Sequence, residues 1–581
     1  MKIPLRQYWK LLVNYLKPQW KQVLLMSVLL LTSIGLQLAN PQILRYFLDT
    51  ALSKGSLDKM IWAGLLFLGL AVITQALGLW ATYTSQNVGW SATNALRNDL
   101  AAHCMRLDMP FHNTHTPGVL IERIDGDVTA LANFFSEFVI RVLGNFILLV
   151  GVLILLFLED WRVGLALTLF SIFAIYVMNR LRDMAVPRSK IEREANATLY
   201  GFLEERMAGM EDLRANGGRS YTMRRFFSIM RDFFFKTRRA YMMYTLLWTI
   251  INGLFTFGYV LTLGLGAYLY VAGVVSLGTA YLFFQYTEMM RTPLEQMTRQ
   301  IQDLQKASAG ILRVQELFNM QPQVRDGAGK ALPSGPLSVE FDRVSFGYNR
   351  EELILDDVNL RLEPGKVLGL LGRTGSGKTT ISRLLFRLYD IQQGQLKLGD
   401  VSIADTHLAD LRRRVGMVTQ EVQLFHASVR DNLTFFDGSI EDGRTLEVLR
   451  EIGLWEWYQA LPEGLDSLLP AGGSGLSAGE AQLLAFARLF LENPGLVVLD
   501  EASSRLDPAT ERLIENAVDK LLQNRTGLII AHRLATVQRA DDIMILENGR
   551  VVEYGPRVLL AADPNSRFYH LLQVGLEETL V

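Results

Sequence analysis

A glycine-rich stretch at residues 372–379, which reads GRTGSGKT, is the first feature whose residue types and spacing could do chemistry. Its glycines let successive backbone N–H groups turn toward a phosphate, Lys378 adds a positive charge, and Thr379 offers a hydroxyl to magnesium. An apolar run at 366–372 precedes it, and a helix expected at about 380–389 points its positive end at the same anion. The pattern predicts a loop that binds nucleotide phosphates.

A second pair of chemical groups stands at Asp500 and Glu501, directly after the apolar run 496–499. A strand that ends there would bring Asp500 to a magnesium ion through water and would let Glu501 polarise an attacking water. On its own, such a pair is more typical of a solvated strand end. The phosphate-binding pattern upstream favours the catalytic interpretation.

The composition shows what must position these groups. The chain has 581 residues, of which 50% are hydrophobic and 20% charged, so it is too apolar for one soluble domain and too long for one core. A formal net charge of -1 gives no overall excess of positive charge that would favour binding of nucleic acid. The single cysteine, Cys104, excludes an internal disulfide and Cys-based zinc clusters.

The first half of the chain contains apolar windows long enough to cross a bilayer, which requires about 20 residues each. We expect six spans, at approximately 22–44, 60–84, 134–158, 161–182, 243–270 and 275–295, with a turn at about 272–278. Burial of these helices inside a large soluble protein is the alternative. Basic residues gather before the first and fifth spans, so both ends of the chain should face the cytosol.

The pattern changes after the sixth span. Residues 319–337 are rich in proline and glycine and predict a linker between a membrane domain at 1–318 and an α/β domain at 338–581. Short apolar runs at 366–372, 495–500 and 527–531 indicate buried strands. Asn548 and Gly549 indicate a hairpin turn. The expected fold is an all-α six-helix transmembrane domain followed by an α/β P-loop ATPase domain.

Between the two chemical motifs, residues 476–480 read LSAGE, close to the LSGGQ signature of ATP-binding-cassette (ABC) transporters. Other motifs of the family follow in the expected order, and the chain resembles that family over nearly its whole length. The resemblance implies that Tyr348 stacks on adenine, Gln420 senses magnesium, His532 contacts the γ-phosphate, and residues 504–507 cross a dimer interface.

The resemblance and the motifs together give a set of expected site residues. Glu501 and His532 are the expected catalytic residues. The residues expected to bind ATP are Tyr348, Gly372, Arg373, Thr374, Gly375, Ser376, Gly377, Lys378, Thr379, Thr380, Gln420 and Asp500, and Thr379, Gln420 and Asp500 would also hold Mg²⁺. The residues expected to contact ATP bound to a partner subunit are Ser477, Ala478, Gly479, Glu480 and Asp507.

Six spans ahead of one nucleotide-binding domain resemble a half-transporter of the exporter type. In that family ATP lies between the phosphate loop of one subunit and the signature of the other, so the chain must dimerise. The resemblance implies ATP-driven export of an amphipathic small molecule, a lipid or a peptide by alternating access, from the plasma or inner membrane with the ATPase domain in the cytosol. Segments 96–127 and 204–217 resemble coupling regions. An ATP-gated channel, regulator or sensor, and an importer, stay open as alternatives.

The signature departs from the family pattern at Ala478 and Glu480, and Ala471 and Gly472 stand where exporters usually carry a Glu-Arg pair. Glu480 adds a negative charge near bound phosphates, and Ala478 adds a methyl group at a close backbone approach. Because Glu501 is present and the signature is altered, the chain resembles the active subunit of an asymmetric heterodimeric exporter. A heterodimer is therefore favoured over a homodimer.

The transported substrate stays open at this point. Glu137 with Arg141, and Glu288 with Arg291, could pair on one helix face, and their position near span ends favours interfacial anchoring. Four aromatic residues in the sixth span would suit either an amphipathic substrate or lipid contact: Tyr281, Phe283, Phe284 and Tyr286.

Overall fold

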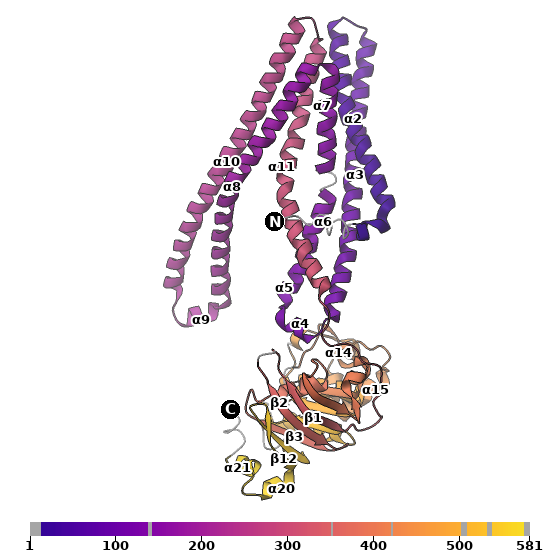
Figure 1. Ribbon diagram of the computed structural model, residues 1–581, viewed down its shortest axis with the longest axis vertical. Helices are drawn as coiled ribbons and strands as arrows, with labels where there is room; N and C mark the ends of the chain where they lie inside the picture. The colour runs from indigo at the N-terminus through magenta and orange to yellow at the C-terminus, as the bar shows by residue number, and fades with distance from the viewer. Residues whose placement is uncertain are drawn as a thin grey trace. The chain divides into compact units, whose positions relative to one another are not determined.

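The computed structural model describes residues 13–137, 142–349, 352–419, 422–473, 475–500, 508–531 and 537–574. The chain divides into two compact units, a helical one (1–105 and 117–320) and an α/β one (106–116 and 321–581). Figure 1 colours both along the chain. Residues 320–338 contain no helix or strand.

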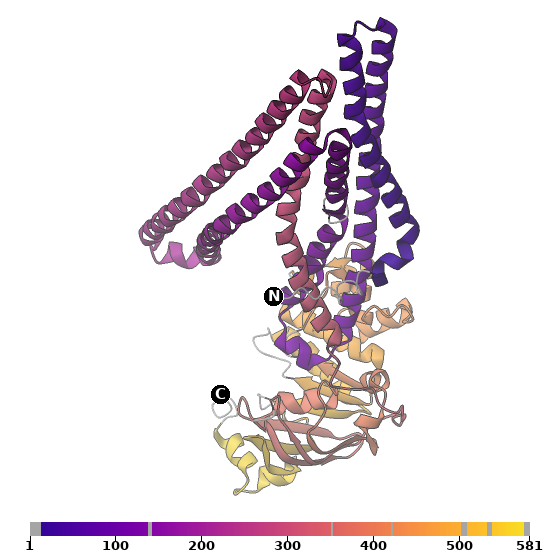
Figure 2. The same ribbon diagram turned by 45° about the horizontal axis from the view of Figure 1, so that its top comes forward.

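Within the described residues, the helical unit contains six helices of 15 residues or more. They are α2 (Trp20–Leu52), α3 (Leu57–Arg106), α7 (Asn145–Glu159), α8 (Trp161–Ala208), α10 (Arg219–Val271) and α11 (Leu277–Asn319). Shorter elements are α5 (Pro117–Ile121), a π-helical segment (Glu122–Asp127), α6 (Val128–Glu137) and α9 (Met210–Ala215). Helices α8 and α10 run side by side to the short α9 in both views of the chain (Figures 1 and 2).

Local signals in the sequence set where these helices begin and end. The side chain of Asp160 accepts a hydrogen bond from the backbone N of Arg162 at 2.8 Å and so caps α8. Ser276 caps α11 in the same way by accepting from Thr279 N at 3.0 Å. Between α10 and α11, Gly273 has a φ of 72°, which glycine adopts without strain. The expected turn at 272–278 is confirmed.

Five of the described helices are long and apolar enough to cross a membrane: 13–52, 57–106, 142–159, 161–208 and 219–271. The expected sixth span falls in α11, whose 43 residues are long enough but which is more polar, since Glu288, Arg291 and Glu295 lie on it. In the expected third span the described residues are helical on both sides of 138–141: α6 ends at Glu137, and π-helical residues 142–144 lead directly into α7. Residues 138–141 lie outside the described part of the structure. Arg141 and the side chain of Glu137 lie outside the described part of the structure.

Helix α11 lies at the centre of the helical unit, where it packs against α2, α7, α8 and α10. The shared core includes Val152 of α7, Phe170 of α8, Phe255 of α10 and Phe283 of α11, all buried. The rings of Phe170 and Phe255 meet edge to face with centroids 6.2 Å apart. The close approach depends on Gly258, because a Cβ there would lie 2.7 Å from the Phe170 ring.

The α/β unit contains two main sheets. The larger has the strand order β12-β11-β3-β10-β9-β6, with every pair parallel except β11 with β12. Its strands are β3 (Val367–Gly372), β6 (Val415–Val418), β9 (Leu496–Asp500), β10 (Thr526–Ile530), β11 (Asp542–Glu547) and β12 (Arg550–Pro556). The antiparallel sheet β2-β1-β4-β5 comprises β1 (Val339–Phe346), β2 (Leu355–Leu362), β4 (Gln393–Leu398) and β5 (Val401–Ser402). A short pair joins β7 (Ala427–Ser428) to β8 (Leu468–Leu469).

Helices accompany these strands along the chain. They are α4 (Met109–Thr114), α12 (Lys378–Leu385), α13 (Leu408–Arg414), α14 (Val429–Thr434), α15 (Asp442–Glu451), α16 (Trp455–Gln459), α17 (Ala478–Glu492), α18 (Pro508–Leu522), α20 (Arg557–Ala562) and α21 (Arg567–Val574). The three strands expected from apolar runs are confirmed as β3, β9 and β10. The expected hairpin joins β11 and β12, with φ values of 48° at Asn548 and 79° at Gly549.

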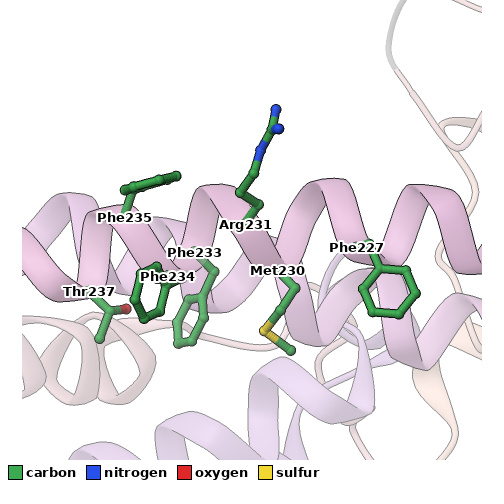
Figure 3. Close-up of a pocket in the computed structure, with 7 residues that line it drawn as sticks. All are labelled: Phe227, Met230, Arg231, Phe233, Phe234, Phe235 and Thr237. Carbon is green, nitrogen blue, oxygen red and sulfur yellow. The ribbon is translucent and has the colours of Figure 1, made fainter.

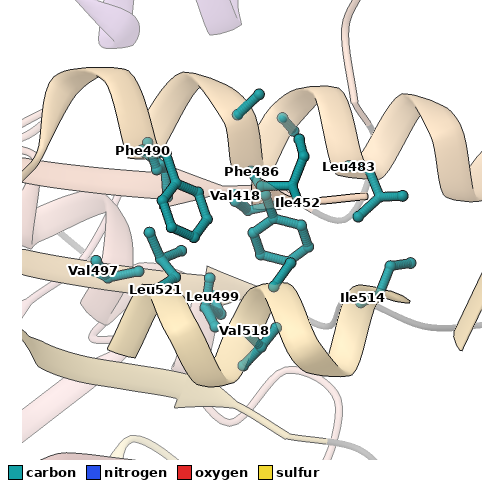
Figure 4. Packing of buried hydrophobic residues seen from close by; sticks show 14 of the residues in the cluster. Val418, Ile452, Leu483, Phe486, Phe490, Val497, Leu499, Ile514, Val518 and Leu521 are labelled. Atoms are coloured by element: carbon teal, nitrogen blue, oxygen red, sulfur yellow. The ribbon is translucent and has the colours of Figure 1, made fainter. Parts of the chain in front are cut away.

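One apolar core fastens α17 and α18 to the larger sheet (Figure 4). Phe486 and Phe490 of α17 lie over Val497 and Leu499 of β9, with Leu521 of α18 beside them (Figure 4). All five side chains are buried, so the core fixes the beginning of α17 and the end of β9 within one rigid body.

Because Phe486 is fully buried in this core, we expect Phe486→Ala to lower the free energy of unfolding of the α/β unit by about 3–5 kcal/mol. Thermal unfolding of the purified chain measures this loss. Leu468→Ala is the matched control, since Leu468 is 67% exposed and should change stability by only about 0.5 kcal/mol. Equal effects of the two substitutions would contradict the assignment of this core.

Candidate active site

The loop between β3 and α12 is the centre of the candidate site. β3 ends at Gly372 and α12 begins at Lys378, so the loop joins a buried parallel strand to a helix N-terminus. Gly377 has a φ of 109°, and a Cβ there would lie 2.6 Å from the side chain of Leu355. This position therefore requires glycine, both for its conformation and for space.

Two polar side chains of this loop are held in a way that fits a bound phosphate. Lys378 is only 6% exposed, and its Nζ donates to the backbone oxygens of Gly372 at 2.6 Å and Arg373 at 3.0 Å. Within the described residues, Ser376 Oγ is buried without a hydrogen-bond partner. A buried hydroxyl of this kind is costly unless a ligand accepts from it, so the loop fits an anionic phosphate group.

The sheet brings Asp500 to the same edge as this loop. β10 lies between β3 and β9, and Ile530 pairs with both Leu370 and Asp500 across the parallel ladders. Because parallel strands end at one edge, Asp500 and the loop after Gly372 face the same crevice. The hydroxyl of Thr379, which is exposed, and the carboxylate of Asp500 are hard oxygen donors, which suits Mg²⁺.

Tyr348, after β1, presents a ring beside this loop. Its hydroxyl lies 3.2 Å from Thr380 Oγ1 and accepts from Arg383 Nη1 at 2.9 Å. The Tyr389 ring meets it edge to face with centroids 5.1 Å apart. The ring remains 40% exposed, so it is fixed at its edges and can stack on a base.

The segment 106–116 belongs to the same unit and contacts this aromatic cluster. Asn113, at the end of α4, donates a hydrogen bond to the hydroxyl of Tyr389, and Asp108 accepts one from Val324 N at 2.9 Å. This part of the expected coupling region 96–127 is therefore joined to the residue that supports Tyr348. In the other expected region, 204–217, the helix α9 links α8 to α10.

The signature-like residues form the N-terminus of α17. Ser477 is the N-cap, and its Oγ accepts from Glu480 N at 3.2 Å. The Glu480 carboxylate accepts in return from Ser477 N at 2.7 Å and from Ser477 Oγ at 2.9 Å. Ser477 and Glu480 thus form a capping box, Gly479 is buried and Ala478 is exposed. The box fixes the hydroxyl of Ser477 on its own helix.

A buried arginine ties this helix to the segment that follows β6. Arg488 donates from Nε to Asn432 O at 2.8 Å and from Nη2 to Gln423 O at 3.1 Å, and it stacks over the Phe435 ring at 4.4 Å. Burial lowers the pKa of Arg488 to about 10, so the group keeps its charge at neutral pH. Charge-assisted bonds to two carbonyl groups make this connection rigid.

Several expected site residues fall outside the described residues: Gln420, Glu501, Asp507 and His532, with the rest of the loop 504–507. Their roles stay predictions. The structure brings together Tyr348, the loop 372–378, Thr379, Thr380 and Asp500. Sequence reasoning missed Asn113, Arg383 and Tyr389, since a lone asparagine, arginine or tyrosine carries no local pattern and acquires its contact only from the fold.

Two family descriptions match separate parts of the chain. The ABC transporter transmembrane region matches residues 23–294, and the ABC transporter description matches residues 355–504. The fold is similar to the structure of a bacterial Atm1-family ABC exporter with ATP bound, with a TM-score of 0.78, 22% identity, and coverage of 95% of this chain and 98% of that one.

Curated relatives are similar over most of their length. An ATP-dependent lipid A-core flippase from Pseudoalteromonas atlantica is 30% identical over 507 residues, covering 86% of each chain. A flippase of the same name from Alcanivorax borkumensis is 27% identical over 588 residues and covers 99% of each chain. The chain therefore belongs to the ABC transporters, and it joins the transmembrane region and the ATP-hydrolysing region of an exporter half in one multi-pass polypeptide.

Proposed function

We propose that this chain is one subunit of a dimeric exporter in which the residues around the loop 372–379 bind ATP and Mg²⁺ and Glu501 activates the attacking water. One observation carries the proposal: the buried hydroxyl of Ser376, which lacks a partner among the described residues, lies in a lysine-bearing loop at the sheet edge where Asp500 ends β9. These residues bind and orient a triphosphate, while Tyr348 positions the base.

Each group has a distinct role in the proposed reaction. Lys378 and the loop N–H groups hold the β- and γ-phosphates in place, and His532 contacts the γ-phosphate. Thr379, Gln420 and Asp500 would hold Mg²⁺, which when bound neutralises charge on the β- and γ-phosphates. Glu501, one residue beyond the strand end, accepts a proton from water as it attacks. The reaction yields ADP and phosphate, and release of these products allows the subunits to separate.

The proposed boundaries follow the expected ones: a membrane domain at 1–318, a linker at 319–337 and an ATPase domain at 338–581. Basic residues before α2, and in the part of α10 that precedes the expected fifth span, support a cytosolic ATPase domain at a plasma or inner membrane. The partners are a second half-transporter, membrane lipid and the transported molecule. No feature of the charge distribution supports nucleic acid as a partner.

Exposed aromatic residues on α10 support a partner subunit. Phe227 and Phe234 are 62% and 57% exposed and line a hollow of about 430 Å³. In Figure 3 they point to the same side of the helix as Met230, whereas Arg231 points away. A span needs about 20 residues, so this part of α10 extends well beyond the bilayer. Exposed aromatic surface outside lipid is typical of a protein contact, and we assign it to the second half-transporter.

The capping box supports a heterodimer over a homodimer. The Glu480 carboxylate accepts a hydrogen bond from the Ser477 hydroxyl. By the family pattern, that hydroxyl would instead donate to the γ-phosphate of ATP bound to the partner. The carboxylate also places a negative charge where that phosphate would arrive, which disfavours closure over this signature. The signature of a different partner chain would then complete the stronger site, the one that contains Glu501.

ATP binding and turnover separate the proposed roles of Lys378 and Glu501. Lys378→Ala should weaken ATP binding by about tenfold or more, because the phosphates lose a buried positive charge. Glu501→Gln should bind ATP normally while turnover falls by roughly 10²- to 10³-fold. Nucleotide titration and phosphate release, measured on the same preparations, test both. Undiminished turnover in Glu501→Gln would remove Glu501 from the catalytic role.

The signature is tested by Glu480→Gln, which keeps the amide oxygen for the cap and removes the charge. We expect turnover by the chain purified alone in lipid to rise about threefold or more, with Ser477→Ala as the control that removes the hydroxyl. Mass measurement shows whether that preparation is a dimer. A homodimer with full turnover that Glu480→Gln leaves unchanged would contradict the heterodimer proposal.

The contact between α4 and Tyr389 leads to a prediction about how transported substrate stimulates ATP hydrolysis. Asn113→Ala and Tyr389→Phe each remove the hydrogen bond to the Tyr389 hydroxyl but leave the ring that supports Tyr348. We expect the KM for ATP to stay within about twofold, whereas stimulation of hydrolysis by transported substrate should fall by about threefold or more. Tyr389→Leu, which removes the ring, should instead raise the KM. Unchanged stimulation in both hydrogen-bond variants would show that this contact does not couple the domains.

A further inference from the structure

Helix α11 presents two different faces in the membrane-spanning part of its length. Leu282, Phe283, Tyr286 and Met290 are fully buried against the neighbouring helices. Tyr281, Phe284, Gln285 and Glu288 recur at helical spacing on the opposite face, where they are exposed or half-buried. The four aromatic residues noted in the sequence are thus divided. Phe283 and Tyr286 belong to the core, whereas Tyr281 and Phe284 remain accessible.

The accessible face carries a connected group of rings and a carboxylate. The Phe284 ring lies 5.5 Å from that of Tyr259 on α10 and 6.1 Å from that of Tyr281. The hydroxyl of Tyr259 donates a hydrogen bond to the carboxylate of Glu288. Two helices therefore contribute three aromatic rings beside one acidic group, an arrangement we call the aromatic–carboxylate site.

Among the described side chains, the charges around this site do not cancel. Arg291 is bound to Glu295 at 3.1 Å and to the side-chain oxygen of Asn252 at 2.7 Å, and it also interacts with the Tyr259 hydroxyl that binds Glu288. Glu288, Arg291 and Glu295 together carry a net charge of -1. On the neighbouring α2, Arg45 is bound to Glu159 at 2.7 Å. Within the described residues, the group formed by Tyr259, Glu288, Arg291 and Glu295 therefore keeps one negative charge that a ligand could balance.

This finding corrects the expectation from the sequence about Glu288 and Arg291. Arg291 forms its ion pair with Glu295, one helical turn further along α11, whereas Glu288 accepts from the Tyr259 hydroxyl, with which Arg291 also interacts. Glu288 also lies about three turns inside α11, roughly 16 Å along its axis, which is near the middle of a hydrocarbon core of roughly 30 Å. An interfacial anchor would lie at a span end, so this position favours a role inside the membrane over the expected anchoring role for Glu288.

An accessible carboxylate at this depth restricts what the face can contact. Exposure of a charge to lipid tails costs several kcal/mol, so ionisable groups at mid-membrane face a water-filled cavity or a ligand. The site must therefore line the interior path of the exporter and not its lipid surface. Aromatic rings beside a carboxylate attract a cation through both the ring quadrupole and the opposite charge.

We propose that the aromatic–carboxylate site formed by Tyr259, Tyr281, Phe284 and Glu288 binds the transported molecule, and that this molecule is a lipophilic cation with one positive charge and an apolar body. The inference rests on the export function and names its substrate class. A polyanionic lipid headgroup is disfavoured at this site, since it would meet a group of described side chains with a net negative charge.

The test uses two probes of the same shape and opposite charge, tetraphenylphosphonium and tetraphenylborate. Binding to the full-length protein in lipid nanodiscs is measured without nucleotide, after subtracting uptake by empty nanodiscs. We expect the wild type to bind the phosphonium at least about tenfold more tightly than the borate. Glu288→Gln should abolish most of this preference, and Glu288→Asp should retain it.

A wild-type protein that binds the two probes equally, or a Glu288→Gln variant with an unchanged preference, would overturn the proposal. ATP hydrolysis by Glu288→Gln in the same nanodiscs reports whether the variant is folded. Because binding is measured without hydrolysis, failure here leaves the proposed roles of Lys378 and Glu501 intact. Loss of hydrolysis in the catalytic variants, conversely, leaves this binding result standing.

Discussion

The parallel pairing of β3, β10 and β9 is the constraint on which the nucleotide site depends. It brings the loop after Gly372 and the carboxylate of Asp500 to one edge, although more than a hundred residues separate them in the chain. The strands hold that register because helices α17 and α18 bury a continuous apolar core against them. A polar site that must hold highly charged phosphates is thus built on the most rigid apolar part of the unit.

Two connections lead away from that edge. One passes from Tyr348 through the ring of Tyr389 to Asn113, in the segment between α3 and the next membrane-unit helix. The other passes from the N-terminus of α17 through Arg488 to the backbone at Gln423 and Asn432. Both rely on side chains whose partners come from distant parts of the sequence. A change at the nucleotide therefore has physical routes to other elements, through packed rings and charge-assisted hydrogen bonds.

The helical unit likewise combines an apolar core with a small number of charged groups. Buried apolar side chains pack around α11, and among its described side chains the group Glu288, Arg291 and Glu295 retains one negative charge. Net charge inside a membrane is expensive, which is the physical reason for the proposed role of Glu288 in binding the transported molecule. Substrate choice in this exporter would then depend on a few ionised groups within an otherwise apolar bundle.

The sequence alone determined the family, the order of a membrane region and an ATPase region, the three core strands and the phosphate loop. These follow from local signals, since apolar runs, glycine spacing and turn residues act within a few neighbouring positions. It predicted six spans, yet α11 falls below the apolar composition of the other five, because a helix buried among others can tolerate polar groups. The roles of Gln420, Glu501, Asp507 and His532 remain predictions from the resemblance.

Only the tertiary structure decided which side chains meet. It paired Arg291 with Glu295 rather than with Glu288, divided the aromatic residues of α11 between core and accessible face, and joined Asn113 to Tyr389. It also showed that Glu480 closes a capping box on Ser477 in addition to adding charge. The reason is the same in each case. Contact between residues far apart in the chain depends on helix rotation and strand order, which local sequence patterns leave open.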